Sequence, residues 1–528
     1  MELGGFSAEP LIPKTEAFPV KRISHSQSRR NSARRKRKVT KRHARAGHWS
    51  RQSSPMLSRG TVHYEIGARG NATSYGGIAA VHELVTKLGL VEEINERLDL
   101  LKVHLPYHES DHVLNLAYNV LCGGTRLEDI ERLRHDTAYM NALGAKLIPD
   151  PTTAGDFCRR FSEADVTRLM EAINAVRRKL WQGRGKALLG SMTYIDVDGT
   201  IAPTHGKKKA GMDISYKGIW GYAPLITSVA NTKEVLHVVN RPGNVPSHTD
   251  AAPWIDRAIE EVLPYAERVC VRGDTDFSLT KHFDGWAEKV DFLFGMDANA
   301  ALCRCAEALG DSAWRRLERG PKYETLTGHK RERYQADEKA RIVRERGYLN
   351  LELNYEDVAE FTYEPGKCKR SYRVVALRKN ISKMKGENTL LDEIRYFFYI
   401  TTRTDLSADE VVRCANERCD QENVIEQLKN GVNALRVPLY DLVSNWAYMV
   451  IAALAWNIKS WFAMMMHRKT ERATYVAMEF PRFIHSMILM PCHVIARARG
   501  ITLRLIGYQP TQDRFFSTWL TIHRTGFR

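Results

Sequence analysis

In this chain of 528 residues, the stretch MTYIDVDGTI at residues 192–201 is the part of the sequence that decides the predicted fold class. Apolar and polar residues alternate along it, as is typical of a β-strand with one buried face. Ile195 and Val197 fall on one face of that strand, and Asp196 and Asp198 fall on the other. Two acidic side chains therefore project from the end of one predicted strand.

The segments that follow this strand predict a mixed sheet. Strand-like runs at residues 225–230 and 235–239 lie on either side of a short turn, as in a hairpin. A helical pattern over 246–266 leads into a short apolar strand at 269–271, and a further strand is predicted at 290–294. Strands followed by alternating helices and strands favour the α/β class.

The rest of the chain divides by its hydrophobic pattern. Apolar residues recur at three- and four-residue intervals in the segment before the first strand, which predicts helices, whereas strand-like alternation returns after residue 300. The predicted parts are a disordered basic arm over 1–60, a helical domain over 65–185, the first part of the α/β core over 190–298, a β-rich insertion over 299–402, the second part of the core over 403–510, and a C-terminal tail over 511–528. The helical domain is a candidate DNA-binding domain, with a plain helical support domain as the alternative.

Positive charge is concentrated near the start of the chain. The net charge is +17, and thirteen lysines and arginines lie between Lys21 and Arg51 without one acidic residue. Such a run stays extended and binds polyanions, so nucleic acid is the expected partner; a dispensable solubility tail is the alternative. A second basic segment lies in the β-rich insertion, where a solvated hairpin face is the alternative. The candidate DNA-binding residues are Arg34, Arg35, Lys36, Arg37, Lys38, Lys369, Arg370 and Arg373.

Two further patterns bear on the location of the protein. The densest apolar run, residues 446–456, is shorter than the roughly 18 residues that a membrane-spanning helix needs, so it predicts a helix buried in a protein core. The nine cysteines contain no CxxC pair, and the chain opens without a signal segment. We therefore expect no membrane association and a reducing, cytoplasmic compartment.

Acidic residues at the ends of predicted strands indicate a site for metal-assisted chemistry. Asp198 and Asp274 both stand at such ends, where open α/β sheets bind ligands. Mg²⁺ prefers a few carboxylates together with water and phosphate oxygens, and a pair of these ions can promote phosphoryl transfer. A glutamate on a helix packed against the sheet would complete the site. Glu422 is that candidate, because Arg418 and Lys429 fall on the same stripe of its predicted helix.

Taken together, three motifs resemble the DDE transposases of bacterial insertion sequences, in the group that carries a β-rich insertion in an RNase H-like catalytic domain. The family signature Tyr-x2-Arg-x3-Glu-x6-Lys matches Arg418, Glu422 and Lys429, whereas Ala415 stands at the tyrosine position. The resemblance covers roughly residues 65–510. The motifs, in order, are DVDGT at 196–200, RGDTDF at 272–277 and RCDQENVIEQLK at 418–429.

The resemblance implies an α/β fold with an RNase H-like mixed sheet, interrupted by the β-rich insertion and preceded by an all-helical domain. It implies that Asp198, Asp274 and Glu422 hold two Mg²⁺ ions, for which Mn²⁺ can substitute. Such an enzyme cuts and joins double-stranded DNA at its element's terminal repeats and at target DNA, as a homodimer in the DNA complex, in the nucleoid-associated cytoplasm of a bacterium. The supporting residues would be Asp196, Arg418 and Lys429, with Asp196 alternatively a metal ligand itself.

Two other classes of protein fit parts of the sequence. DVDGT also resembles the first motif of haloacid dehalogenase-type Mg²⁺-dependent phosphatases, in which Asp196 would be the nucleophile and Asp198 the acid. That class needs a lysine shortly before its second acidic pair, but no lysine lies between Arg241 and Arg272. The second alternative is a catalytically inactive DNA-binding relative, and the presence of all three acidic residues argues against it.

Overall fold

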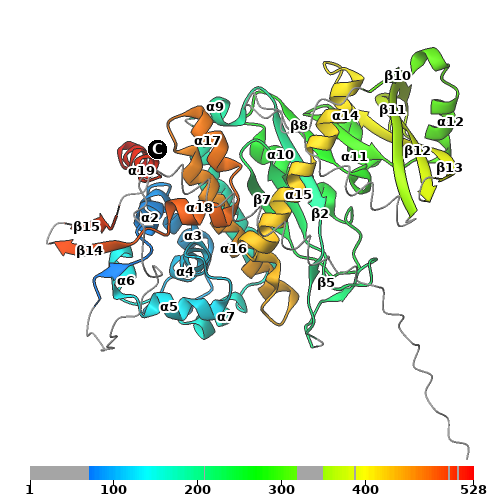
Figure 1. Ribbon diagram of the computed structural model, residues 1–528. Helices are drawn as coiled ribbons and strands as arrows, with labels where there is room; N and C mark the ends of the chain where they lie inside the picture. Colours follow the sequence, from blue (N-terminus) through cyan, green and yellow to red (C-terminus); the bar gives the residue numbers. More distant parts are fainter. Residues whose placement is uncertain are drawn as a thin grey trace, which may run out of the picture. The chain divides into compact units, whose positions relative to one another are not determined.

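The computed structural model describes residues 70–182, 184–206, 208–317, 349–385, 388–497, 500–507 and 511–527 (Figure 1). All of them belong to one compact unit, Arg69–Arg528. The predicted basic arm, with Arg34, Arg35, Lys36, Arg37 and Lys38, lies outside the described residues.

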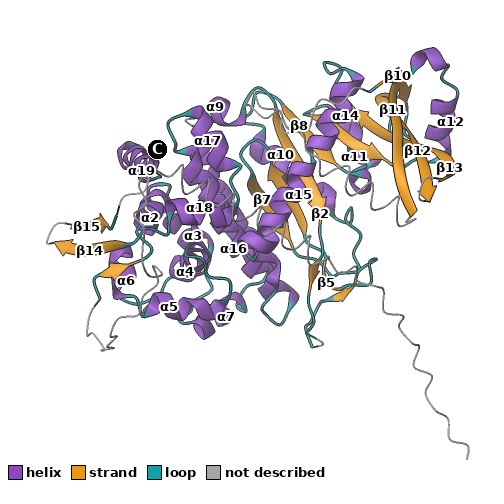
Figure 2. Ribbon diagram, in the orientation of Figure 1, coloured by secondary structure: helices purple, strands orange, loops and turns teal. Residues whose placement is uncertain are grey.

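A mixed sheet of nine strands, in the order β10-β11-β12-β13-β9-β8-β2-β6-β7, forms the centre of this unit (Figure 2). β2 runs parallel to β8, and β8 parallel to β9, whereas β6 is antiparallel to both β2 and β7. The predicted fold class, a mixed α/β sheet with helices, is confirmed. The strands of this core are β2 (Thr193–Gly199), β6 (Leu225–Val229), β7 (Glu234–Val239), β8 (Val269–Gly273) and β9 (Asp291–Met296).

The β-rich insertion is an extension of the same sheet. Its long antiparallel strands are β11 (Leu349–Tyr363), β12 (Tyr372–Lys385) and β13 (Asn388–Thr401), with the short β10 (Arg315–Arg316) at the edge. β13 pairs antiparallel with β9, from Phe398 opposite Met296 to Thr401 opposite Leu293. The insertion and the core therefore share one hydrogen-bonded sheet.

Helices cover both faces of the core strands. α10 (Ala251–Val262) packs on the face that carries Ile195 and Val197. α14 (Ala408–Glu417) packs on the other face, where Cys270 and Leu293 meet its apolar side chains. Two shorter helices, α11 (Thr280–Ala287) and α12 (Ala300–Glu307), follow β8 and β9 along the chain.

The helix that carries the predicted glutamate is interrupted. Ser407 caps α14 as a capping box with Glu410, whose carboxylate accepts from the Ser407 N–H at 2.8 Å. The sequence predicts one helix from this cap to Asn430, but α14 ends at Glu417. The chain continues as α15 (Cys419–Glu426) and a π-helical turn, Gln427–Gly431.

The segment before the sheet is helical, as predicted, and a long apolar helix packs against it. That helix, α16 (Leu442–Met464), contains the run 446–456 and contacts α4, α8 and β7, so it lies between the helical segment and the sheet. No helix within the described ranges is long and apolar enough to cross a membrane. The helices of this segment are α2 (Ile78–Lys87), α3 (Leu90–Arg97), α4 (Glu109–Leu121), α5 (Ile130–Arg134), α6 (Thr137–Leu143), α7 (Pro151–Cys158), α8 (Glu163–Gln182) and α9 (Gly185–Leu189).

The final part of the chain folds back onto the helical segment. α19 (Gln512–Arg524), in the stretch expected to be a tail, contacts α2, and the Trp519 indole N–H donates to Glu83 at 2.9 Å. The other elements of this part are α17 (Lys469–Val476), α18 (Phe480–Met487), and the strands β14 (Cys492–Arg497) and β15 (Gly500–Leu505), which form a small sheet with β1 (Ala72–Thr73).

A buried ion pair connects the helical segment with the sheet. Arg177 of α8 donates from Nε to Glu234 of β7 at 3.0 Å, and both side chains are buried. The carboxylate of Glu234 also accepts from the indole N–H groups of Trp181 and Trp461, at 3.1 and 2.7 Å. Arg177 donates further to the Val235 carbonyl at 2.6 Å. Three elements, α8, β7 and α16, are thus joined at one charged centre.

A buried lysine on α16 makes stability depend on pH. Burial lowers the pKa of Lys459 to about 7 from an ordinary value of 10.5, although its ammonium lies over the Trp456 ring at 4.1 Å. Above pH 7 the folded chain loses this proton while the unfolded chain keeps it, so stability rises with pH through this group. We expect the unfolding free energy of the wild type to gain up to about 1.4 kcal/mol per pH unit relative to Lys459→Met between pH 7 and 10.

Denaturant titrations of both proteins across this pH range measure the difference directly. Comparison with the variant cancels the contributions of the other titrating groups. Parallel pH profiles for the two proteins would show that Lys459 keeps its proton in the folded state.

Candidate active site

Two aspartates leave the sheet side by side at the ends of β2 and β8. The register of these parallel strands pairs Asp196 with Arg272, so Asp198 and Asp274, each two residues further on, lie at the same edge. Asp274 is held at the start of a 3₁₀ turn, where its Oδ1 accepts from the Asp276 N–H at 3.1 Å. The structure therefore brings together the two acids that the sequence placed at neighbouring strand ends.

The environment of these carboxylates disfavours their negative charge. The pKa of Asp198 is raised to about 6, mainly by burial; the Arg418 guanidinium opposes this effect and the Asp274 charge adds to it. Burial also raises the pKa of Asp274, again against the opposing charge of Arg418. Two half-buried carboxylates that repel each other form a site whose energy falls when a cation is supplied.

Of the helix stripe predicted from the sequence, Arg418 contacts Asp198 directly, and Lys429 feels its charge. Arg418, at the junction of α14 and α15, donates from one terminal nitrogen to Asp198 Oδ2 at 2.9 Å. Glu422 follows one helical turn later, is exposed, and has no hydrogen-bond or ion-pair partner among the described residues. Lys429 is half-buried on the π-helical turn, and burial lowers its pKa while the charge of Asp198 opposes that effect.

Asp196 is an internal structural group. Both of its oxygens accept from Arg272, at 2.7 and 2.9 Å, and both side chains are buried. Burial alone would lower the pKa of Arg272, but the Asp196 carboxylate raises it. Arg272 also donates to the Cys414 carbonyl at 3.0 Å, which joins β2, β8 and α14 next to the half-buried Asp198 and Asp274.

Comparison with known proteins identifies the family. Residues 62–526 match the profile of a family described as transposase DDE domain group 1. The chain belongs to this transposase family. A cryo-EM structure of the piggyBac transposase synaptic complex with hairpin DNA is similar to it over 79% of this chain and 83% of that chain, with 10% sequence identity and a TM-score of 0.34. No curated protein matches the sequence.

Membership of the DDE transposase family leaves little support for the phosphatase alternative. That alternative makes Asp196 the nucleophile, but Asp196 is buried, and Arg272 occupies both of its oxygens. A group in this position cannot attack a substrate phosphate.

One acidic residue near the site escaped the sequence analysis. Asp297 follows β9 directly, and its charge contributes to the raised pKa of Asp274. It lines a hollow of about 360 Å³ together with Asp274 and Arg418, and with Tyr396 and other aromatic residues of β13. Like Asp274, Asp297 directly follows a strand, and this position could have indicated it. The predicted strand, however, ended at residue 294, three residues before Asp297.

The basic residues of the insertion mostly make internal contacts. Arg373 donates to Glu360, and to the Arg403 and Leu406 carbonyls at 2.8 and 2.6 Å. Arg370 forms an ion pair with Glu288 at 3.0 Å, whereas the Lys369 side chain is exposed. Arg373 thus holds the insertion against the chain that leads into α14. The sequence had suggested a different role, an exposed contact with phosphates.

A group of possible metal ligands lies in the helical segment. His104, His108 and Glu109 place ligand atoms within 4.8 Å of one another. The two imidazole rings are stacked at 4.9 Å and 10° from parallel, so they cannot both direct an in-plane lone pair at one ion in this arrangement. Glu109 instead accepts from the N–H groups of Leu100 and Leu101, at 3.0 and 3.1 Å, which fixes the loop before α4.

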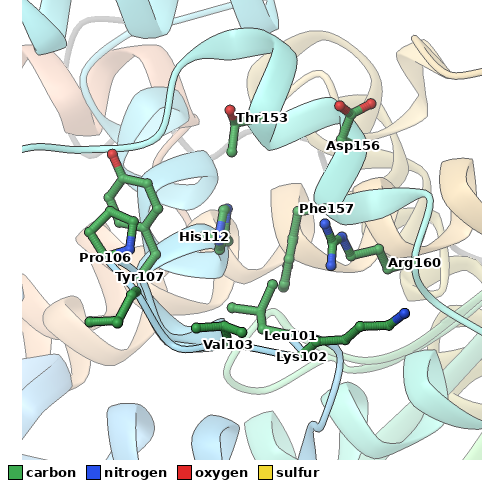
Figure 3. A pocket seen from close by; sticks show the side chains of 11 residues that line it. Leu101, Lys102, Val103, Pro106, Tyr107, His112, Thr153, Asp156, Phe157 and Arg160 are labelled. Atoms are coloured by element: carbon green, nitrogen blue, oxygen red, sulfur yellow. The ribbon is translucent and has the colours of Figure 1, made fainter.

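That loop borders a second hollow, of about 540 Å³, shown in Figure 3. The stacked rings of His112 and Phe157, 4.4 Å apart, form its apolar side, and Lys102 and Arg160 also line it. All of its lining residues come from 101–112 and 153–160, so it contains none of the strand-end carboxylates.

Proposed function

We propose that this family member is a metal-dependent DNA transposase whose active site contains Asp198, Asp274 and Glu422. It would bind the ends of its element, hydrolyse the phosphodiester there, and join the freed 3′ hydroxyl to target DNA. The observation that carries the proposal is the pair of mutually repelling carboxylates at adjacent strand ends, with Arg418 bound to one of them.

The donor set fits a hard divalent cation. Asp198, Asp274 and Glu422 offer carboxylate oxygens only, which suits Mg²⁺, or Mn²⁺ in its place, better than a soft transition metal. These three residues would hold two ions. When bound, such ions lower the pKa of a water or 3′ hydroxyl and stabilise the leaving oxygen of an in-line displacement.

Two basic residues, Arg418 and Lys429, accompany the proposed metal ligands. Arg418 fixes the Asp198 carboxylate through one nitrogen, and its other N–H groups have no partner within the described part of the chain, so they are available to a phosphate oxygen. Lys429 supplies a second positive charge on the same side. The buried Asp196–Arg272 pair supports both strand ends without touching substrate.

The proposed partner is double-stranded DNA, namely the element's terminal repeats and a target. The basic arm and Lys369 would contact phosphates without reading sequence. Two ends must be held for joining, so the working complex would be a homodimer. The proposed setting is the nucleoid of a bacterial cell that carries the insertion sequence.

The decisive experiment compares two glutamates on one helix. Glu426 lies one turn after Glu422 and is also exposed, so Glu426→Gln is a matched control for Glu422→Gln. With labelled DNA carrying the sequences that flank the gene, and with Mg²⁺ or Mn²⁺, we expect Glu422→Gln to lose cleavage and joining by at least about a hundredfold. We expect Glu426→Gln to retain both.

Each other result has a definite meaning. If only Glu426→Gln loses cleavage and joining, the third acidic residue of the active site is Glu426, one helical turn after Glu422. Hydrolysis of a small phosphate monoester that survives Glu422→Gln but fails in Asp196→Asn would favour the phosphatase. DNA binding by the wild type without any cleavage would favour the inactive relative.

A further inference from the structure

A small β-hairpin projects next to the proposed active site. We call residues 213–222 the finger: it consists of β4 (Asp213–Ile214), a turn, and β5 (Trp220–Tyr222). β5 also pairs with β3 (Ala202–Pro203), which begins four residues after Asp198. Figure 1 shows β5 beyond one end of β2. The finger is thus paired with a strand that begins shortly after one of the proposed ligands.

The base of the finger is closely packed. The Tyr222 ring is buried, and its hydroxyl donates to the Ala210 carbonyl at 2.9 Å. Gly221 lies against the Ala202 carbonyl, and Gly243 against the Asp213 carbonyl, at distances that leave no space for a side chain. Lys209 donates to the Val437 carbonyl. Because this base is held on several sides, the position of the tip is defined relative to the strand end that carries Asp198.

The tip exposes an unusual amount of apolar surface. Tyr216 is 86% exposed, Trp220 51%, Ile214 45% and Ile219 39%, all within seven consecutive residues. Single exposed apolar residues are ordinary on a protein surface, but a cluster of them indicates an interaction surface. Neither Tyr216 nor Trp220 contributes to a packed core, so their exposure has no structural explanation within the described chain.

Positive charge accompanies the exposed rings at the tip of the finger. Lys217 places its ammonium 5.3 Å from the centre of the Tyr216 ring. Lys217 is itself exposed, so the positive charge and the aromatic rings lie on the same surface of the finger. Exposed aromatic rings interleaved with lysines are characteristic of surfaces that bind single-stranded nucleic acid, where bases stack on the rings and the backbone follows the positive charge.

We propose that Tyr216 and Trp220 stack on unpaired bases of the DNA strand whose phosphate lies between Asp198 and Asp274. This inference rests on the proposed function, because it takes DNA as the substrate. Paired bases are stacked on each other and present only their edges, so the flat faces of these rings are matched by unpaired bases next to the cut. The finger would thereby hold a strand in place while the phosphate is attacked.

Binding of two synthetic DNAs, without any divalent metal, tests this proposal. One probe is a short blunt duplex, and the other is the same duplex with a single-stranded extension that contains 2-aminopurine. We expect the wild type to bind the extended duplex more tightly and to quench its fluorescence. In the variant with both Tyr216→Ala and Trp220→Ala, affinity for the extended duplex should fall roughly tenfold or more, with little change for the blunt duplex.

Phe516→Ala is the matched control, since Phe516 is an exposed aromatic residue on α19. It should behave as the wild type. Equal affinity of the wild type for both probes, or an unchanged preference in the double variant, would overturn the proposal, and so would an equal loss in Phe516→Ala. If binding of the extended duplex depends on Tyr216 and Trp220 but the wild type cleaves no DNA, the role of the finger is supported and the proposed catalysis is contradicted. If the wild type cleaves DNA but its preference for the extended duplex does not depend on these residues, the catalysis is supported and the role of the finger is contradicted.

Discussion

Asp198→Asn and Asp274→Asn are each expected to lower the rate of DNA strand cleavage by about a thousandfold or more, without unfolding the protein. An amide has the shape of a carboxylate but not its charge, so the substitution removes the ligand that a divalent cation needs most. Burial and mutual repulsion already disfavour the charge of both residues in the folded chain. We therefore expect unfolding temperatures that are equal to or higher than that of the wild type.

Asp276→Asn is the control for this pair. Asp276 is exposed and lies two residues after Asp274, to whose carboxylate its N–H donates. Because that contact uses the backbone, the substitution leaves it intact and should preserve cleavage. Single-turnover cleavage and thermal unfolding of the three variants measure both quantities. If Asp274→Asn cleaves normally and Asp276→Asn does not, the second acid has been assigned to the wrong aspartate.

The second large effect is expected on stability, at the ion pair between α8 and β7. Glu234→Leu should lower the unfolding free energy by about 3–5 kcal/mol, because it leaves the buried Arg177 guanidinium without its counter-charge. It also leaves the indole N–H groups of Trp181 and Trp461 without their acceptor. Denaturant-induced unfolding measures this loss.

Two further variants separate the ion pair from other effects. Arg177→Met combined with Glu234→Leu should recover part of the loss, since no unpaired charge remains in the interior. Lys233 lies in the same hairpin as Glu234 and forms a surface ion pair with Asp420. Asp420→Asn removes this partner and should lower the unfolding free energy by less than about 1 kcal/mol. A similar cost for Glu234→Leu and Asp420→Asn would mean that water reaches the Arg177 site in solution.

The features that the sequence predicted well depend on short-range patterns. Alternation predicted a strand that ends near Asp198, and helical periodicity predicted a helix through Glu422; the structure contains both, as β2 and α15. The apolar run 446–456 likewise predicted a buried helix, which the structure contains as α16.

The features that were missed depend on contacts between distant segments. The Asp196–Arg272 pair and the internal contacts of Arg373 each join residues that no local pattern relates. The pairing of β13 with β9 could not be predicted either, because the alternating pattern of a strand does not show which other strand it pairs with. The interruption of the helix at Arg418 coincides with the residue that reaches Asp198, and no helix-breaking residue signals it.

The pairing of β13 with β9 also limits how the surroundings of Asp274 can change shape. A domain attached only by two linkers can swing as a hinged lid, but here such a movement would first have to break the backbone hydrogen bonds between Leu293–Met296 and Phe398–Thr401. The aromatic wall of the hollow beside Asp274 therefore moves together with β9 and β8 as one piece. If DNA binds here as proposed, it would meet an aromatic wall whose position relative to Asp274 is already fixed by backbone pairing.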